Sequence, residues 1–443
     1  MYLKRLRLKN IKCYKDFTID FVSETGKIRH WTSILGNNGV GKTIILQCIA
    51  LALASGTSLH ELVPYPERWV RSNHSKGMFE ATIVFDKSEL PEKKSPKEIT
   101  LRYDVLGSKQ RKTNDMEYSV PRIVEPINHI AYTYFTRNLK HSPLFVAGYG
   151  VYRGQSLTNT YTKNDRRGNP RSERILSLFK NTSLMQDIEG WIQTLDYRKL
   201  KSENKKDNDF FEKAIQIIEK VLPGIKYSDI NLEGELFVKT KSNDKIPLRE
   251  LSDAYLTLFS WTGDLIMRLF QTFPKLKDPT KAKGVILVDE IGLHLHPLVQ
   301  RKIVEQLREI FPHVQFIITS HSPFIAQASE KGEVFVLEDR EGHTVLKPFE
   351  GTLKGWRVDQ ILTTIFGLKT TRDIGIEKKL IEYDYLLQKS HEESFLKTDK
   401  QKMLKLKKEL DKEELPEDLP DINEQKKELS ELIKRLKETR KEK

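Results

Sequence analysis

Cysteine and long apolar runs are both scarce in this sequence. Only two cysteines, Cys13 and Cys48, occur among 443 residues, too few for a disulfide framework, which favours a reducing compartment. No segment approaches the roughly 18 consecutive apolar residues that a membrane-spanning helix needs. The first residues, MYLKRLRLKNIKCYKDF, lack the apolar core and the cleavage site of a signal peptide. We therefore expect a cytoplasmic protein with no membrane partner.

Acidic residues are the minority among the charged side chains. Lysine and arginine number 75 against 62 for aspartate and glutamate, which gives a formal net charge of +13. Such an excess favours contact with a polyanion, although it is weak evidence for nucleic-acid binding by itself. Three basic clusters are candidate DNA contacts, with ordinary solvated loops as the alternative. They are Lys4, Arg5, Arg7, Lys9 and Lys12; Lys163, Arg166, Arg167, Arg171 and Arg174; and Arg198 to Lys206.

Apolar periodicity predicts an α/β protein. Alternating apolar residues over 2–22 indicate two short strands, and HWTSILG indicates a third strand that leads into a glycine-rich turn and an apolar helix. A long helix is expected after Ser252. Strands and helices then alternate, which is typical of a mostly parallel sheet. The expected elements are strand 284–289, helix 297–311, strand 314–319, helix 322–329 and strands near 333–338 and 344–348.

One large domain with a helical extension is the predicted organisation. Residues 1–350 are expected to form an α/β head. Within it, residues 57–145 contain short strand patterns that indicate a β-rich insertion, and residues 173–225 show the periodicity of a helical lobe. Residues 351–443 are expected to form a charged helical extension, such as a helical hairpin or coiled-coil arm, which binds a partner or mediates oligomerisation.

A phosphate-binding loop is predicted between the third strand and the apolar helix. Every fixed position of G-x-x-x-x-G-K-[ST] is matched by Gly36, Asn37, Asn38, Gly39, Val40, Gly41, Lys42 and Thr43. Glycines let successive backbone N–H groups turn toward a phosphate, and the following helix adds its positive N-terminus. Lys42 would neutralise the charge of the β- and γ-phosphates, and the Thr43 hydroxyl would bind Mg²⁺. A glycine-rich turn with a surface lysine is the alternative.

The stretch GVILVDEIGLHLHP ends a predicted buried strand in two acids. At the carboxyl end of such a strand, Asp289 would hold Mg²⁺ and Glu290 would polarise the attacking water. His294 and His296 follow, and they raise the question of a zinc site. No cysteine or third suitably spaced ligand adjoins them. We therefore favour the alternative that one histidine packs and the other contacts a neighbouring subunit.

A second strand, VQFIITSHSPFI, ends in Thr319, Ser320 and His321. A Ser-His strand end beside a nucleotide site favours a hydrogen-bonding sensor of the γ-phosphate. The alternative for His321 is a role as the cap of the next helix.

Together these motifs resemble those of ABC-type ATPases of the SMC, RecF and OLD-like group. LKNIKCYKDFTIDF, LGNNGVGKT, LSDAY, VILVDEIGLHLHP and IITSHSPFIAQ occur in the order of that group. The resemblance implies an ABC-type P-loop ATPase head that binds ATP and Mg²⁺, with Asp289 and Glu290 as the Walker B pair and His321 as the switch histidine. It also implies that Ser252, the signature serine, reaches the γ-phosphate held by an opposite subunit, so that the protein forms at least a dimer.

Two departures from the pattern of this group concern turnover and phosphate sensing. Asp253 and Ala254 replace the usual signature residues and add a negative charge and a methyl group near the expected phosphate, which predicts slow hydrolysis. A Q-loop glutamine is not evident from the motif. Gln155 and Arg153 are both candidates for that position.

The later stretch GWRVDQILTTIFGLKTTRD resembles the ATPase subunits of bacterial antiphage systems of the Septu type, including those associated with retrons. OLD-type relatives carry a TOPRIM nuclease, but no Glu followed by an Asp-x-Asp strand end follows His321. The resemblance therefore implies control of a separate partner nuclease, of the HNH type in Septu systems. The alternatives are a RecF- or SMC-like DNA-maintenance ATPase and a nucleotide-dependent scaffold with little hydrolysis.

Overall fold

The computed structural model divides into two compact units, Met1–Gly367 and Leu368–Lys443, which are described separately. The description covers residues 1–54, 59–86, 97–107, 122–124, 145–153, 170–180, 185, 187–201, 205–368, 371, 373–390 and 396–412.

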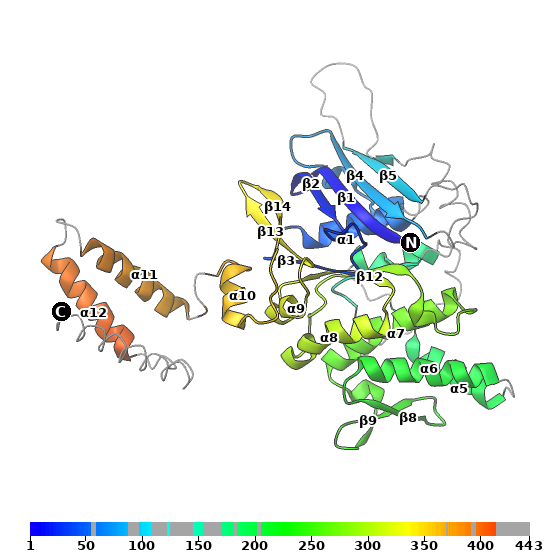
Figure 1. Ribbon diagram of the computed structural model, residues 1–443. Coiled ribbons are helices and arrows are strands. Elements are labelled where there is room, and N and C mark those ends of the chain that lie inside the picture. Colours follow the sequence, from blue (N-terminus) through cyan, green and yellow to red (C-terminus); the bar gives the residue numbers. More distant parts are fainter. Residues whose placement is uncertain are drawn as a thin grey trace, which may run out of the picture. The chain divides into compact units, whose positions relative to one another are not determined.

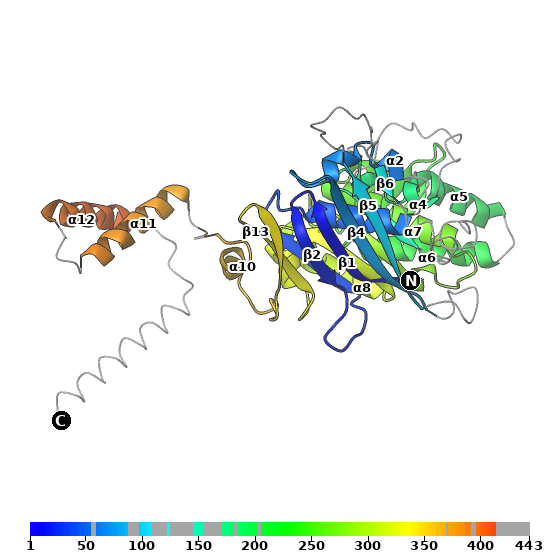
Figure 2. The same cartoon turned by 90° about the horizontal axis from the view of Figure 1, so that it is seen from above.

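An antiparallel sheet with strand order β2-β1-β4-β5-β6 begins the first unit (Figure 2). Its strands are β1 (Tyr2–Ile11), β2 (Tyr14–Asp20), β4 (Lys76–Val84), β5 (Glu98–Leu106) and β6 (Arg122–Val124). The predicted hairpin at the start is confirmed by the antiparallel pairing of β1 with β2. The β-rich stretch predicted over 57–145 supplies β4, β5 and β6, and β4 pairs along the length of β1, so these strands complete the same sheet.

The second sheet is the predicted, mostly parallel core. Its order is β14-β13-β3-β12-β11-β7, and only the pairing of β13 with β14 is antiparallel. The carboxyl ends of the parallel strands therefore meet at one edge, where ligands bind in such sheets. The strands are β3 (Trp31–Gly36), β7 (Val146–Tyr149), β11 (Gly284–Val288), β12 (Val314–Ser320), β13 (Val334–Arg340) and β14 (His343–Pro348).

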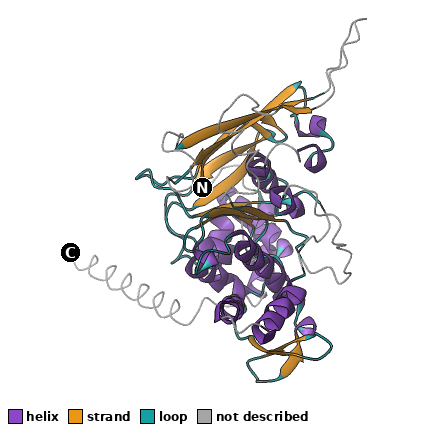
Figure 3. Cartoon of the chain, turned by 90° about the vertical axis from the view of Figure 1, so that its right-hand side faces the viewer, coloured by secondary structure: helices purple, strands orange, loops and turns teal. Residues whose placement is uncertain are grey.

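Alternating side chains of the core sheet enter two different hydrophobic clusters. On β11, Val285 and Leu287 face the antiparallel sheet, whereas Ile286 and Val288 face the opposite helical layer. The apolar helix α1 (Lys42–Ala54) contacts strands of both sheets and lies between them (Figure 1), and its apolar side chains are buried. Figure 3 shows strands and helices of the head in separate layers. Helix α1 is apolar around its circumference because both of its sides are covered.

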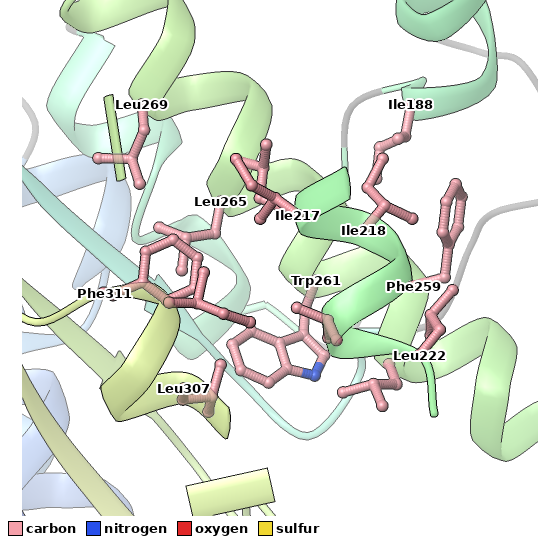
Figure 4. Packing of buried hydrophobic residues seen from close by; sticks show 14 of the residues in the cluster. Ile188, Ile217, Ile218, Leu222, Phe259, Trp261, Leu265, Leu269, Leu307 and Phe311 are labelled. Atoms are coloured by element: carbon pink, nitrogen blue, oxygen red, sulfur yellow. The ribbon is translucent and has the colours of Figure 1, made fainter. Parts of the chain in front are cut away.

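Helices cover the other face of the core sheet. They are α5 (Ile188–Lys201), α6 (Lys205–Val221), α7 (Asp253–Thr272) and α8 (Pro297–Ile310), and their apolar side chains surround Trp261 (Figure 4). The predicted helical periodicity over 173–225 is confirmed for α5 and α6. Before them, the described residues of this stretch form the short turns α4 (Pro170–Glu173) and Leu176–Leu178. There the Ser177 hydroxyl donates to Gly148 O and accepts from the Gly150 N–H. These hydrogen bonds hold the segment alongside β7 instead of in a helix.

A small sheet follows the helical lobe. It contains β8 (Lys226–Ile230), β9 (Leu236–Lys239) and β10 (Lys245–Pro247) in the order β10-β9-β8. The hairpin predicted before Ser252 is confirmed, and β8 adds a third strand to it.

The first unit extends beyond the predicted boundary at residue 350. Helix α10 (Val358–Thr364) contacts α9 (Pro323–Gln327), and Ile361, Ile365 and Phe366 pack in one cluster with Val334 and Val336 of β13. The head therefore ends at Gly367, because these apolar side chains are buried against the edge of the core sheet.

The second unit contains a helical hairpin. Its helices are α11 (Ile374–Lys389) and α12 (Lys397–Lys412). Ion pairs join Lys389 to Asp399 at 2.8 Å near the turn and Lys379 to Glu409 at 3.4 Å farther away, so the helices run antiparallel. The predicted hairpin is confirmed for these residues, and the expected helix over 413–443 lies outside the described residues.

The long helix α7 carries two charged side chains that are buried. Within it, Asp264 and Arg268 form a buried ion pair at 2.6 Å, and Tyr149 donates to Asp264 at 2.9 Å. A buried pair of this kind is tolerated because its partners are hydrogen-bonded.

Among the helices of the described residues, none is both long and apolar enough to cross a membrane.

The helical layer predicts a clear stability difference between two leucines. Leu265 on α7 is 0% exposed, whereas Leu298 on α8 is 63% exposed. Leu265→Ala should destabilise the fold by about 2–5 kcal/mol, because it leaves a cavity among packed side chains. Leu298→Ala should change stability by less than about 0.5 kcal/mol. Thermal unfolding followed by circular dichroism compares the two, and equal melting temperatures would contradict the assigned packing.

Candidate nucleotide site

The predicted phosphate loop lies between β3 and α1, as the strand-loop-helix pattern requires. Gly39 and Gly41 have φ values of +83° and +94°, a conformation that L-residues rarely adopt. Position 41 is further restricted by its neighbours. A Cβ atom there would lie 2.5 Å from Cys13 Sγ and 2.9 Å from Tyr14 Oη. Glycine is therefore required at 41 for two independent reasons.

Side chains from two other segments hold carbonyls of this loop. Tyr14 Oη donates to Gly41 O at 2.9 Å, and Thr344 Oγ1 donates to Val40 O at 2.9 Å. Burial raises the pKa of Tyr14 well above its usual value, so the phenol stays protonated and donates. Asn37 Nδ2 donates to Phe366 O at 3.3 Å. The supporting roles of Tyr14 and Thr344 were not predicted, because the strand pattern gives no signal for them.

Lys42 is held inside the loop. Its side chain is 6% exposed, and Nζ donates to Gly36 O at 2.8 Å and to Asn37 O at 3.1 Å. The same ammonium lies 3.1 Å from Glu290 Oε1. The predicted phosphate-binding lysine and the predicted catalytic carboxylate are therefore an ion pair in this structure.

Asp289 connects the loop with two strands of the core sheet. The Thr43 hydroxyl donates to Oδ2 at 2.8 Å, and the Thr319 hydroxyl donates to Oδ1 at 2.6 Å. Burial raises the pKa of Asp289, and these two hydrogen bonds oppose the increase. The two predicted Mg²⁺ ligands, Thr43 and Asp289, thus lie in direct contact. A hydroxyl and one carboxylate fit Mg²⁺, which keeps several waters and takes further oxygens from phosphates.

Glu290 lies between the phosphate loop and His321. Its backbone has a φ of +46°, and its N–H donates to Thr319 Oγ1 at 2.8 Å. Glu290 Oε2 accepts from the His321 backbone N–H at 3.2 Å and lies 2.8 Å from His321 Nδ1. The capping alternative for His321 is wrong, because Ser322 caps α9 by accepting from Phe324 N.

The matched family models describe ATPase domains. Residues 1–112 match the model described as "AAA ATPase domain". Residues 145–326 match "AAA domain, putative AbiEii toxin, Type IV TA system". The two matches contain the phosphate loop and the Asp289–Glu290 strand end, respectively.

Two curated proteins and one solved structure are also similar to this chain. "Septu protein PtuA" of Bacillus mycoides (strain KBAB4) is 27% identical over 382 residues, which are 84% of this chain and 45% of that protein. "Retron Vc95 probable ATPase" of Vibrio cholerae serotype O1 biovar El Tor is 24% identical over 76% of this chain and 74% of that protein. A crystallised "SmcHead bound to the C-winged helix domain of ScpA" covers 79% of this chain and 98% of that structure, with 14% identity and a TM-score of 0.50.

The chain is thus similar to ATPase-domain families and to proteins named as Septu and retron ATPases. Its fold is that of an SMC head. The chain spans less than half of the length of the Septu protein from Bacillus mycoides.

In this chain, the expected signature serine lies outside the cluster around Lys42. Ser252 is exposed and precedes α7 as its N-terminal cap residue, but its side chain makes no capping hydrogen bond. Asp253 begins the helix. The Ser252 hydroxyl is therefore accessible at a helix N-terminus, where an anion is favoured.

The two histidines after Glu290 form no metal site. Both His294 and His296 are exposed, and no group of three or more His, Cys, Asp or Glu residues in the described part of the chain could hold a metal ion. The expectation that one of them packs is wrong. His294 has a φ of +63° in the turn, and His296 caps α8 by accepting from Leu298 N at 3.3 Å.

Of the two Q-loop candidates, only Arg153 is described. It is 1% exposed, and its guanidinium donates to carbonyls beside the carboxylates instead of lining an open surface. Gln155 lies outside the described residues.

Several side chains of the predicted basic clusters are paired or buried, whereas Lys9, Arg198 and Lys201 are exposed. Lys4, Arg5 and Arg7 form ion pairs with Glu98, Asp20 and Asp16 at 2.6, 2.6 and 3.2 Å. In the second cluster Arg171 is buried, whereas Lys163, Arg166 and Arg167 lie outside the described residues. In the third, Lys199 pairs with Glu212 at 2.7 Å.

Two glycine substitutions test the geometry of the phosphate loop. Gly41→Ala should weaken nucleotide binding by about tenfold or more, because the new Cβ meets Cys13 and Tyr14 in addition to the backbone strain. Gly39→Ala should have a smaller effect, because its φ is also positive but no atom lies within 4 Å of the new Cβ. Titration with a fluorescent ATP analogue measures both affinities. Equal losses would show that the contacts around Gly41 do not matter.

Proposed function

We propose that this chain is the ATP-binding and ATP-hydrolysing subunit of a bacterial antiphage defence complex, in which it controls a separate partner nuclease. The observation that carries the hydrolytic part is the cluster of Lys42, Thr43, Asp289, Glu290 and His321 at one edge of the core sheet. The likeness to proteins named Septu and retron ATPases supports the defence role.

The contacts among these side chains give each of them a different role in the proposed reaction. Thr43 and Asp289 would hold Mg²⁺, which supplies positive charge to the phosphates when bound. Lys42 would bind phosphate oxygens. When its ammonium leaves Glu290 for the phosphates, the Glu290 carboxylate becomes free to accept a proton from water. His321 holds Glu290 Oε2 and fixes the orientation of the carboxylate.

A second copy of the chain would complete each site. The support is the exposed position of Ser252 at the start of α7 and the likeness of the fold to an SMC head. A serine hydroxyl and a helix N-terminus both favour an anionic phosphate. Asp253 beside it would oppose close approach of the phosphate, which predicts slow turnover.

The helical extension is the proposed contact region for a partner or for oligomerisation. Several large apolar side chains of the hairpin are exposed, and they include Ile374, Ile381, Tyr385 and Leu404. Apolar side chains gathered on a surface favour protein contacts. The HNH type of the partner nuclease is proposed from the resemblance to Septu systems.

The other two functions have less support. Direct DNA binding by a RecF-like ATPase would use the basic cluster on β1, yet three of its side chains already form ion pairs. A scaffold that barely hydrolyses ATP would not require Glu290 between Lys42 and His321. DNA-stimulated turnover with strong salt dependence would favour the DNA-binding function.

Two variants separate binding from hydrolysis. Lys42→Ala should abolish nucleotide binding, because a buried cation of the phosphate loop is lost. Glu290→Gln should keep the affinity for ATP but lower kcat by about 100-fold or more, because the amide cannot accept the proton. Glu305→Gln, at an exposed glutamate of α8, is the control. Normal hydrolysis by Glu290→Gln would remove Glu290 from the role of base, and very slow turnover unaffected by it would favour the scaffold.

Co-purification tests the partner and the assembly. The tagged full-length chain, co-expressed with the protein of its genomic neighbour, should retain that protein, and the mass of the complex should include at least two copies of the chain. A nuclease as neighbour supports the proposal. A neighbourhood of replication and recombination genes, with no protein retained, would reject the defence role but not the ATPase chemistry.

A further inference from the structure

Arg153 is a buried cation immediately behind the candidate catalytic turn. It follows β7 and is 1% exposed. Nη1 donates to Gly150 O at 3.1 Å and to Asp289 O, and Nη2 donates to Glu290 O at 2.6 Å. These acceptors are main-chain oxygens, and two of them belong to the residues that carry the catalytic carboxylates.

This choice of acceptors is unusual for a buried cation. Burying a guanidinium is unfavourable, and it is normally offset by a carboxylate that accepts two hydrogen bonds. The Arg153 guanidinium instead spans the carbonyls of two chain segments, and no described residue accepts from its Nε. Burial lowers the pKa of Arg153 to about 10, so the group remains a cation near neutral pH. An ordinary salt bridge does not account for its position.

The turn that Arg153 binds has a backbone that glutamate rarely adopts. Glu290 has a φ of +46°, and its peptide groups are held from two sides. Thr319 accepts the Glu290 N–H from the β12 side, whereas Arg153 binds the Glu290 carbonyl from the β7 side. The direction of the Glu290 carboxylate toward Lys42 and His321 depends on this backbone.

We propose that Arg153 is a positioning residue, which fixes the Asp289–Glu290 turn so that the Glu290 carboxylate faces the phosphate loop before nucleotide binds. This inference rests on the proposed hydrolysis. Arg153 acts through Glu290 and does not contact the phosphates, since its Nη groups already bind carbonyls. Lysine cannot replace it, because a single ammonium does not reproduce the planar fork of donors.

Kinetics of Arg153→Lys in the full-length protein test the inference. We expect kcat to fall at least tenfold, with the KM and Kd for ATP within about twofold of wild type, because only the direction of Glu290 changes. Arg174→Lys is the matched control. The Arg174 guanidinium is partly buried, but it donates to Thr272 Oγ1 at 3.0 Å and lies over the Phe145 ring. It should leave kcat unchanged.

A double variant distinguishes positioning from a general loss of structure. In a Glu290→Gln background, single-turnover rates should show no further loss from Arg153→Lys, because both changes act on one carboxylate. An additive loss, an unchanged kcat in the single variant, or a weaker Kd with normal kcat would each overturn the inference.

Hydrogen exchange of backbone amides in the wild-type protein tests the inference without a variant, so it still applies if Arg153→Lys does not fold. Without nucleotide, the Glu290 and Leu293 amides should exchange slowly, because the turn is already formed and Leu293 N donates to Glu290 O at 2.9 Å. Rapid exchange at both would overturn the inference. If wild-type protein hydrolyses no ATP, the proposed hydrolysis is rejected, and this measurement still decides whether the turn is preformed.

Discussion

The two hydrogen bonds that Asp289 accepts join the three parts of the candidate site. Thr43 brings the phosphate loop to one carboxylate oxygen, and Thr319 brings the end of β12 to the other. Inside the protein, such bonds to a charged group are stronger than neutral ones, and leaving either one unmade is costly. The register of β11 against β12 and the start of α1 must therefore agree, or the buried carboxylate loses a partner.

The packing of the layers fixes the start of α1 relative to β11 and β12. Helix α1 is enclosed between the two sheets, so its N-terminal residues Lys42 and Thr43 cannot shift without disturbing packed side chains on both sides. The antiparallel sheet contributes more than a cover. Tyr14 and Cys13, at the turn between β1 and β2, lie against Gly41 and limit the shape of the loop. The beginning of the chain thus shapes a site whose carboxylates, Asp289 and Glu290, follow strand β11 of the core sheet.

Local patterns in the sequence predicted which side chains lie together better than they predicted the domain boundaries. The glycines before Lys42 and the two acids after a buried strand need only short segments to be recognised, and the structure brings them together. The place of β4 was missed because its pairing with β1 joins distant segments, which periodicity does not report. The end of the head was predicted too early because the amphipathic α10 resembles the helices that follow it. Arg153 bonds to carbonyls, which every residue carries, so the positions that it would bind leave no trace in the sequence.

The contact between Asn37 and Phe366 joins the phosphate loop to the end of the first unit. Asn37 belongs to the loop, and Phe366 is the second-last residue of that unit. The side chain that follows the first glycine of the loop therefore binds the main chain more than 300 residues later. Any movement of Asn37 has to break this hydrogen bond or displace the last residues of the head with it.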